Sequence, residues 1–391
     1  MKRLLLIFGI LLLITQCESD NNDDIDVVDP TDDITDDQVA DVVFSRADLL
    51  TNWADNIIIP SYQNLQASLN EVETVFNTFS TDVSEGNLIA LREAWLAAYF
   101  VWQNASPFET GPAEARGFRL NINSYPTDVP DIEEAVTFEG TADEVDLVSF
   151  SNRTIKGFPA LDYLLNGSAA SDAAIVARFT DTNEGANLIS YTGRVLGDMQ
   201  RLTNEVLGEW TDSFRDAFID NDGSSATAST DIYVNDYIFH YEFFIRSGKV
   251  GIPAGLFSDG EVLPQNIEAR FIGGNVSNQL CIAAIDAVQD FFNGVGTNSG
   301  VDGIGLDDYL EAVDPRVDNQ GTGLAISVND QYDEARTTIQ NLQDFEIELQ
   351  DDLPLPMIRA FDELQGIVPL IKSTMLSFLN IALDFQDGDG D

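Results

Sequence analysis

The sequence contains very little histidine: His240 is the single imidazole among 391 residues. A His-Glu-x-x-His zinc helix needs two imidazoles one helical turn apart, so this class of metalloenzyme is excluded. A Ser-His-Asp triad would have to use His240, and no Gly-x-Ser-x-Gly segment supplies the nucleophile. No Walker loop is present, and no Gly-x-Gly-x-x-Gly motif follows a strand. His240 lies on the apolar stripe of a predicted helix, which favours a buried structural histidine over a functional one.

The sequence also lacks an apolar run long enough to cross a membrane. Its longest run, Leu4–Ile14, follows Met1-Lys2-Arg3 and falls short of the ~20 residues that span a bilayer. A basic start followed by a short apolar run is typical of a secretory signal. The run ends at Leu13-Ile14-Thr15-Gln16-Cys17, which has the form of a bacterial lipoprotein box. We therefore predict a signal peptide over 1–17, lipidation of Cys17 and attachment to the outer membrane. The alternative is an ordinary signal peptide with a chance cysteine.

Cysteine is equally scarce, with Cys17 and Cys281 the two in the sequence. Once Cys17 carries lipid, Cys281 has no partner, so the body is held by its core and not by a disulfide. The neighbours Leu280 and Ile282 predict a buried thiol and not a nucleophile. An apolar content of 44% is sufficient for one large or two ordinary domains.

Positive charge is the third scarcity: 19 Lys and Arg stand against 67 Asp and Glu, which gives a net charge of −48. Such a chain repels nucleic acid and anionic membrane surfaces, so the lipid at Cys17 is the expected link to the membrane. Residues 18–43 are dense in Asp and contain no aromatic residue, Lys or Arg, which predicts a disordered acidic tether. The start of this tether, Glu18-Ser19-Asp20, resembles the surface-export signal of Bacteroidetes lipoproteins. The body is therefore expected to face the cell surface or the periplasm.

From residue 44 onward, the dominant pattern is a 3.6-residue apolar period, which predicts amphipathic helices. No run shows the two-residue alternation of a strand bounded by hairpin turns. We therefore expect an all-α fold of two packed helical bundles, over 44–210 and 211–385, followed by an acidic tail at 386–391. Pro60 is expected to bend or split the helix that runs from about Arg46 to Phe79. The other predicted apolar stripes are Leu88–Trp102, Val195–Val206, Tyr233–Phe244, Cys281–Phe292, Val328–Leu349 and Val368–Ala382.

Three segments dense in Gly, Pro and aromatic residues interrupt these helices: Ser106–Pro112, Lys156–Leu165 and Arg246–Gly255. In the third segment, Arg246 and Lys249 lead into a Gly/Pro turn. These two cations either cap the end of the preceding helix, bind an anionic ligand, or pair with Asp162 or Glu109. From the residues alone, helix capping is the simplest of these alternatives.

The order and spacing of these segments resemble the imelysin family of bacterial envelope proteins. The matching stretches are Trp53–Tyr62, Arg92–Trp95, Trp102-Gln103, Phe108–Pro112, Tyr125–Asp128, Gly157–Asp162 and Lys249–Pro253. Together they cover the chain from about 44 to 385. The resemblance implies two helical bundles packed into one imelysin-like unit, with a candidate site at their junction. Family members are linked to iron uptake or iron-regulated expression, and the family is classed by name with peptidases.

The family's metal motif is Gly-x-His-x-x-Glu, whereas the corresponding stretch here is Gly157-Phe158-Pro159-Ala160-Leu161-Asp162. Proline has no ligating side chain, and one carboxylate is a poor transition-metal site without further ligands. The resemblance therefore implies no catalytic residue and a candidate binding cleft that contains Glu109, Gly157, Asp162, Arg246 and Lys249. Asp162 is the metal candidate by motif position, with Glu109 as its partner for iron or another divalent cation. The favoured alternative is that Asp162 pairs with Arg246 or Lys249 and clamps the junction.

These observations predict a non-enzymatic envelope lipoprotein that assists the uptake of iron or another metal. Two alternatives stay open at this point. One is a divergent metallopeptidase-like hydrolase that uses Asp162 with Glu109. The other is an acidic scaffold that docks on an outer-membrane transporter.

Overall fold

Helices account for all the regular secondary structure in the part of the chain that the structure describes, which confirms the predicted all-α fold. The structure is a computed structural model, and it describes residues 44–314 and 322–385. The predicted signal peptide, the lipidated Cys17, the tether and the acidic tail lie outside the described residues. No helix in the described ranges is long and apolar enough to cross a membrane.

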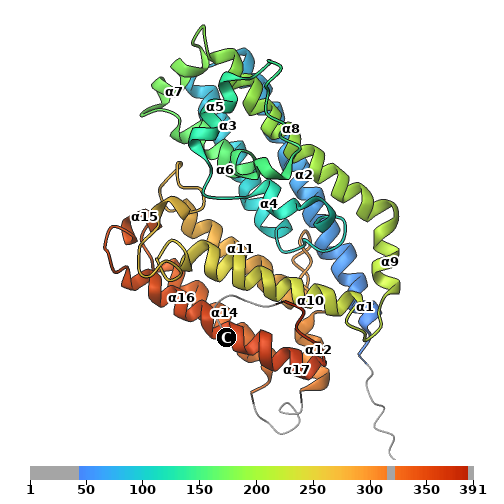
Figure 1. The fold of residues 1–391 in the computed structure, drawn as a ribbon. Helices are drawn as coiled ribbons and strands as arrows, with labels where there is room; N and C mark the ends of the chain where they lie inside the picture. Colours follow the sequence, from blue (N-terminus) through green and yellow to red (C-terminus); the bar gives the residue numbers. More distant parts are fainter. Residues whose placement is uncertain (1–43, 315–321, 386–391) are drawn as a thin grey trace, which may run out of the picture. The chain divides into compact units, whose positions relative to one another are not determined.

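The described chain contains α-helices, short 3-10 segments and π-helical segments, and the last two kinds are labelled η (Figure 1). In chain order the elements are α1 (Arg46–Asn52), η1 (Trp53–Ile58), α2 (Ile59–Thr81), α3 (Glu85–Ala105), η2 (Glu114–Arg116), α4 (Phe118–Ile122), α5 (Val129–Thr137), η3 (Phe150–Ile155), α6 (Gly157–Asp162), η4 (Tyr163–Gly167), α7 (Asp172–Phe179), α8 (Gly185–Glu209), η5 (Trp210–Phe214), α9 (Arg215–Asp220), α10 (Ser229–His240), η6 (Tyr241–Gly251), η7 (Pro264–Asn266), α11 (Val276–Phe292), α12 (Leu306–Val313), α14 (Leu324–Gln340), α15 (Phe345–Glu348), α16 (Leu355–Val368), η8 (Pro369–Met375) and α17 (Leu376–Leu379).

Polar side chains explain where several of these helices begin. Ser45, Ser84, Asp128 and Ser171 each precede a helix and accept a hydrogen bond from a backbone N–H in its first turn. The first N–H groups of a helix have no partner within the helix, so such a cap stabilises it by about 1 kcal/mol.

Pro60 does not split its helix. The segments α1, η1 and α2 follow one another without a break from Arg46 to Thr81, and Pro60 lies in the first turn of α2. Proline has no backbone N–H to donate to the preceding turn. The π-helical segment η1, which ends at Ile58 just before α2, accommodates this loss, because its wider turn shifts the hydrogen-bond pattern by one residue.

Two of the predicted stripes differ from the helices of the structure. The stripe from Val328 to Leu349 was expected to be one helix, but α14 ends at Gln340 and α15 begins at Phe345. Asp344 caps α15, so a turn separates two helices whose apolar residues are buried on both sides of it. The last stripe runs without a break through the end of α16, η8 and α17, but its final residue, Ala382, lies beyond α17. The apolar spacing predicted which residues are buried better than it predicted where a helix ends. The reason is that a short turn can preserve the buried face.

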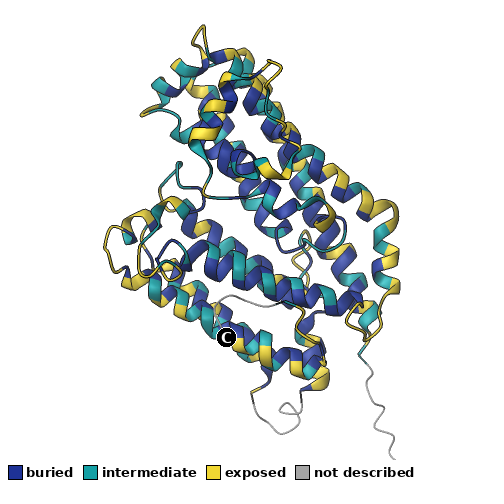
Figure 2. Cartoon of the chain, in the orientation of Figure 1, coloured by how far each residue is buried: buried dark blue, intermediate teal, exposed yellow. Residues whose placement is uncertain are grey.

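The helices pack in two groups that are joined by a direct helix contact. In the first group, α2 lies against α3 and α8. In the second, α14 lies against α11 and α16, and α16 also packs against η6. The contact between α11 and α3 joins the groups, and Figure 2 shows buried residues on the sides where helices meet. All described residues belong to one compact unit. The boundary at 210/211 between two bundles stays a prediction.

Gly157 allows α6 to start in close contact with α4. Its φ of +75° lies in the left-handed region that L side chains rarely adopt. A Cβ atom at Gly157 would lie 2.1 Å from the carbonyl oxygen of Ile122, the last residue of α4. Both the backbone conformation and the available space therefore require glycine at this position.

We predict that Gly157→Ala lowers the free energy of unfolding much more than Gly140→Ala. Gly140 has a similar φ of +73°, but no atom lies within 4 Å of the position that a Cβ atom would take there. Both substitutions incur the left-handed backbone cost of about 1 kcal/mol, and Gly157→Ala adds a clash worth about 2 kcal/mol more. Chemical denaturation of the two variants measures the difference. Equal losses of stability would show that the contact with Ile122 is unimportant.

Candidate functional site

The segment that follows α3 is held by Asp236 and Arg119, which sequence reasoning did not single out. The backbone N–H groups of Glu109 and Thr110 donate to Asp236 Oδ2 at 2.9 and 3.2 Å. Arg119 Nη2 donates to Asp236 Oδ1 at 3.1 Å, and the backbone N of Arg119 donates to Glu109 Oε2 at 2.7 Å. Arg119 belongs to α4 and Asp236 to α10. The predicted site residue Glu109 is thus fixed from two helices that are far apart in the sequence.

A cavity of about 250 Å³ opens beside Glu109. Its charged lining residues are Glu109, Glu114, Asp236, Asp384 and Arg119, so carboxylates outnumber cations. Burial raises the pKa of Glu109 to about 7, against the lowering effect of the Arg119 charge and N–H. The charges of Asp236 and Glu114 raise it further. This acidic pocket therefore suits a neutral or positively charged ligand better than an anion.

Lys249, another predicted site residue, is buried and forms an ion pair with Glu268. Its Nζ also donates to Gln103 Oε1 at 3.0 Å. The other oxygen of Glu268 accepts from Asn123 Nδ2 at 2.8 Å. The carboxylate of Glu268 therefore links the loop residue Asn123 to Lys249 of η6, which in turn contacts Gln103 of α3. Sequence reasoning missed Glu268, whose one signal was an acidic residue between two apolar ones in a loop.

Asp162 is buried, and among the described residues it pairs with neither Lys249 nor Arg246, so the predicted clamp is wrong. Its Oδ2 accepts from the backbone N of Phe271 at 2.8 Å. Its Oδ1 accepts from the backbone N of Ile272 and from Asn166 Nδ2, each at 3.0 Å. Burial raises the pKa of Asp162 to about 7, although these N–H donors act in the opposite direction. Asp162 thus anchors the loop that contains residues 271–272.

Arg246 lies within η6 but contacts a different helix from Lys249. Its Nη1 donates to Gln365 of α16, and its guanidinium carbon lies 5.3 Å from the centre of the Phe361 ring. The structure therefore brings together only part of the predicted cleft. Glu109 and Lys249 each line a cavity that Arg119 also lines. Asp162 and Arg246 contact other segments.

The arrangement offers no catalytic group of a familiar kind. His240 is 2% exposed, and its Nε2 lies 3.3 Å from Ser106 Oγ. In a triad a carboxylate would orient Nδ1, but Nδ1 has no partner among the described residues. Burial lowers the pKa of His240, and the charges of Arg119 and Lys249 lower it further. Burial also raises the pKa of the Cys281 thiol to about 12, which removes it as a nucleophile near neutral pH.

The side chains of the described residues also do not form a metal-binding centre. In the ranges 44–314 and 322–385, no three His, Cys, Asp or Glu side chains form a group that could hold a metal ion. Asp162, the predicted metal candidate, already accepts three hydrogen bonds. Metal binding by Asp162 stays a prediction, and the hydrogen bonds around its carboxylate do not support it.

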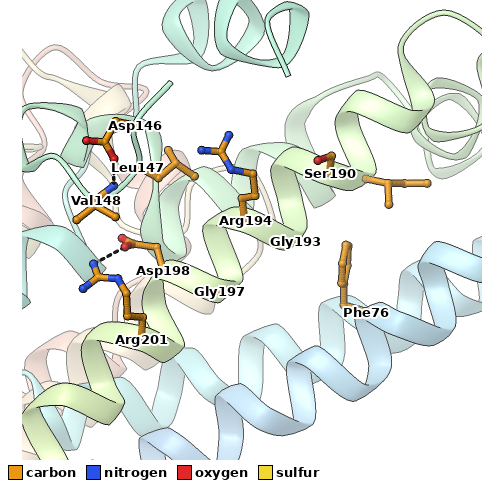
Figure 3. A pocket seen from close by; sticks show the side chains of 11 residues that line it. Phe76, Asp146, Leu147, Val148, Ser190, Gly193, Arg194, Gly197, Asp198 and Arg201 are labelled. Atoms are coloured by element: carbon orange, nitrogen blue, oxygen red, sulfur yellow. Dashed lines mark hydrogen bonds and ion pairs between the residues drawn. The ribbon is translucent and has the colours of Figure 1, made fainter. Parts of the chain in front are cut away.

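A larger groove of about 630 Å³ lies along α8, away from the predicted site residues. Figure 3 shows Arg194, Gly193, Gly197 and Arg201 along the helix, with Phe76 facing them from α2. Arg194 lies 3.0 Å from a Glu139 oxygen, and Arg201 lies 2.6 Å from an Asp198 oxygen. Because the cations of the groove are already engaged by carboxylates, the groove offers an apolar surface with little unused charge.

Comparisons with known proteins agree on one family. A family model described as imelysin matches residues 58–358. Iron-regulated protein A of Synechococcus elongatus is 30% identical over 122 residues, which are 30% of this chain and 32% of that protein. The chain thus spans about a third of the length of this curated relative.

Two crystal structures share the fold. One is of a protein named an iron-regulated protein A precursor, from Parabacteroides distasonis, with a TM-score of 0.64 and 15% identity. The match covers 84% of this chain and 95% of that one. The other is of an imelysin-like protein from Psychrobacter arcticum, with a TM-score of 0.64, 17% identity and coverage of 87% and 97%. At these identities the similarity establishes the fold alone.

We predict that Glu109→Gln flattens the pH dependence of stability between about pH 4.5 and 7. A Glu with a pKa of about 7 in the folded state keeps a proton that the unfolded chain, with the ordinary Glu pKa of 4.5, has already released. The folded state binds more protons in this window, so the free energy of unfolding falls as the pH rises. Removing the carboxyl should reduce this fall by roughly 3 kcal/mol.

Denaturant titrations at several pH values measure the slope. Glu85→Gln provides the control, because Glu85 is exposed at the start of α3 and should leave the slope unchanged. A Glu109→Gln variant with the slope of the unmodified protein would contradict the prediction.

Proposed function

Because the chain belongs to the imelysin family, we propose that it is a non-enzymatic envelope lipoprotein that binds a metal complex during iron acquisition. The N-terminal pattern that ends at Cys17 supports an outer-membrane lipid anchor, with the body on the periplasmic or the cell-surface side. The name of the Synechococcus relative, iron-regulated protein A, supports the link to iron. The same name occurs for one of the two proteins that share the fold.

The proposal rests on one observation: the carboxylate of Asp162 is already occupied by hydrogen bonds within the protein. At the motif position where family members have His and Glu, this chain has Pro159 and Asp162, and both are buried. Asp162 receives the backbone N–H groups of Phe271 and Ile272. A metallopeptidase requires a bound metal with an open position for water. Neither Pro159 nor the occupied carboxylate of Asp162 supports such a centre, which favours binding over hydrolysis.

The acidic pocket beside Glu109 indicates what kind of complex is bound. Its volume of about 250 Å³ accommodates a small organic group, and its lining lacks a compact set of metal ligands within the described chain. The excess of carboxylates from Glu109, Glu114 and Asp384 disfavours anionic complexes. We therefore expect a preformed iron complex that is neutral or positively charged, and not a bare ion.

Calorimetric titration of the soluble form without the lipidated cysteine, residues 18–391, tests the proposal. We expect the cationic complex ferrioxamine B to bind with its pendant ammonium group in the pocket, and ferric citrate, zinc and calcium ions not to bind. Glu114→Gln should weaken binding by about tenfold if one charge-assisted contact is lost. Glu114 is exposed and lines the pocket, so this variant should fold normally. Glu85→Gln serves as the charge-matched control outside the pocket.

Asp162→Asn separates the binding role from the metal-centre role. We expect it to lower stability by about 2 kcal/mol, because an amide replaces one acceptor oxygen with a donor that faces a backbone N–H. We expect the affinity for ferrioxamine B to stay unchanged. Binding of a bare metal ion that disappears in Asp162→Asn would refute the proposal. Casein digestion that disappears in Asp162→Ala would establish the hydrolase instead.

A further inference from the structure

The acidic pocket beside Glu109 also has an aromatic side. Besides the charged residues, its lining contains Phe239 of α10 and Phe385, which follows α17 in the chain. The two rings pack edge to face, with their centres 5.3 Å apart. The face of an aromatic ring carries partial negative charge and attracts cations. The rings and the carboxylates of this pocket therefore favour the same kind of ligand, one with a positive charge.

One wall of the pocket is the segment 382–385, which Asn235 of α10 holds by its backbone. Asn235 Nδ2 donates to the carbonyl of Ala382 at 3.0 Å, and Asn235 Oδ1 accepts from the backbone N of Asp384 at 3.1 Å. The Asn235 side chain is buried, so the two bonds are shielded from water. This pair of contacts keeps Asp384 and Phe385 in the lining.

Two carboxylates of the lining have no cation beside them. Asp236 is paired with Arg119, whereas Glu114 and Asp384 form no ion pair with any residue in the described ranges. Glu109 uses Oε2 for the backbone N–H of Arg119, and its Oε1 accepts no hydrogen bond within the described chain. The pocket therefore offers several acceptor oxygens and a surplus of negative charge.

An organic ammonium ion fits this lining better than a metal ion or a neutral molecule. A metal ion needs its oxygen ligands to converge at ~2.0–2.6 Å, and no such group of side chains occurs in the described chain. A neutral ligand would take carboxylates out of water without balancing their charge. A primary ammonium group donates three hydrogen bonds in different directions, and its carbon chain can lie against the rings.

The volume of the pocket agrees with a short alkyl chain. About 250 Å³ corresponds to several water molecules at ~30 Å³ each. The other cavity that Arg119 lines, beside His240 and Lys249, measures about 20 Å³ and has room for roughly one water molecule. An organic group can therefore enter the acidic pocket but not its neighbour.

We propose that the acidic pocket recognises a primary alkylammonium group, which the carboxylates of Glu109, Glu114 and Asp384 bind while the rings of Phe239 and Phe385 contact its carbon chain. This inference rests on the proposed function, because it concerns the same pocket, and it names the chemical group by which a bound complex is selected. Recognition of the ammonium group itself requires no iron.

Pentylammonium, the pendant arm of ferrioxamine B, is the probe for the test. Its binding to the soluble form without the lipidated cysteine is measured by ligand-observed NMR in about 0.15 M sodium chloride, which screens attraction to the acidic surface. We expect saturable binding that is at least tenfold tighter than that of 1-pentanol, which lacks the charge, and of pentyltrimethylammonium, which lacks the N–H donors. Equal affinity for pentylammonium and for either of the other two compounds would overturn the proposal.

Asp384→Asn removes one of the proposed charges without breaking an ion pair of the described chain. We expect it to weaken pentylammonium binding by about tenfold, as for the loss of one charged hydrogen bond. Asp143→Asn is the matched control, because Asp143 is exposed and lies outside the pocket lining. Unchanged binding in Asp384→Asn would refute the assigned site.

Phe385→Leu tests the contribution of the aromatic side. Leucine keeps an apolar side chain but has no ring face, so we expect pentylammonium binding to weaken by about fivefold, as for one cation–ring contact. Phe150→Leu is the control, since Phe150 is 45% exposed and does not line the pocket. Equal affinities of the two variants would contradict the role of the ring, whether or not the charge of Asp384 matters.

Titrations with ferrioxamine B separate this inference from the proposed function. If pentylammonium binds as described and ferrioxamine B does not, the role in iron acquisition fails and the ammonium site stands. If ferrioxamine B and its N-acetylated form, which lacks the ammonium group, bind equally well, the ammonium site is wrong and the binding of an iron complex stands. We expect acetylation to weaken binding by at least tenfold.

Discussion

Arg119 is the charged group on which the arrangement of the junction depends. Its side chain is 4% exposed, and an unpaired cation at such a position would cost several kcal/mol. It donates instead to the carbonyls of Ser106 and Pro107 and to Asp236. Its backbone N–H also fixes Glu109. One buried guanidinium thus joins the end of α3, α4 and α10, and it lines both junction cavities.

The two cavities that share Arg119 differ in the charged residues that line them. On the Glu109 side the lining is rich in carboxylates, and burial has already raised the pKa of Glu109 toward neutrality. On the His240 side the lining contains Arg119 and Lys249 and no carboxylate. Both cations are paired with carboxylates, Asp236 and Glu268, that lie outside the lining of the smaller cavity.

The Gly157–Asp162 segment has a structural role in this chain. Gly157 is required because α6 approaches the end of α4 too closely for any side chain. Asp162, at the end of α6, accepts two hydrogen bonds that hold the 271–272 loop and a third from Asn166. Pro159, between them, needs no polar partner because its side chain is buried among apolar neighbours of α6. The segment therefore serves as a packing element of the junction in this chain.

The sequence alone determined the features that depend on local patterns. The apolar period indicated the all-α fold, the single His240 excluded zinc helices and argued against a triad, and the order of short motifs identified the family. The same local patterns predicted which residues are buried more reliably than where a helix stops, as the division of the stripe after Gln340 illustrates. These results follow because a helical period and a turn motif are properties of a few consecutive residues.

Only the tertiary structure decided which charges meet. Lys249 pairs with Glu268, although the sequence suggested Asp162 or Glu109 as its partner. Arg119, for which the sequence suggested no partner, pairs with Asp236. With 67 acidic residues and 19 cations, each Lys or Arg has many candidate partners, and the sequence contains no signal that ranks them. The choice depends on which carboxylate the packing of distant helices buries beside each cation, because a buried charge must be paired where it lies.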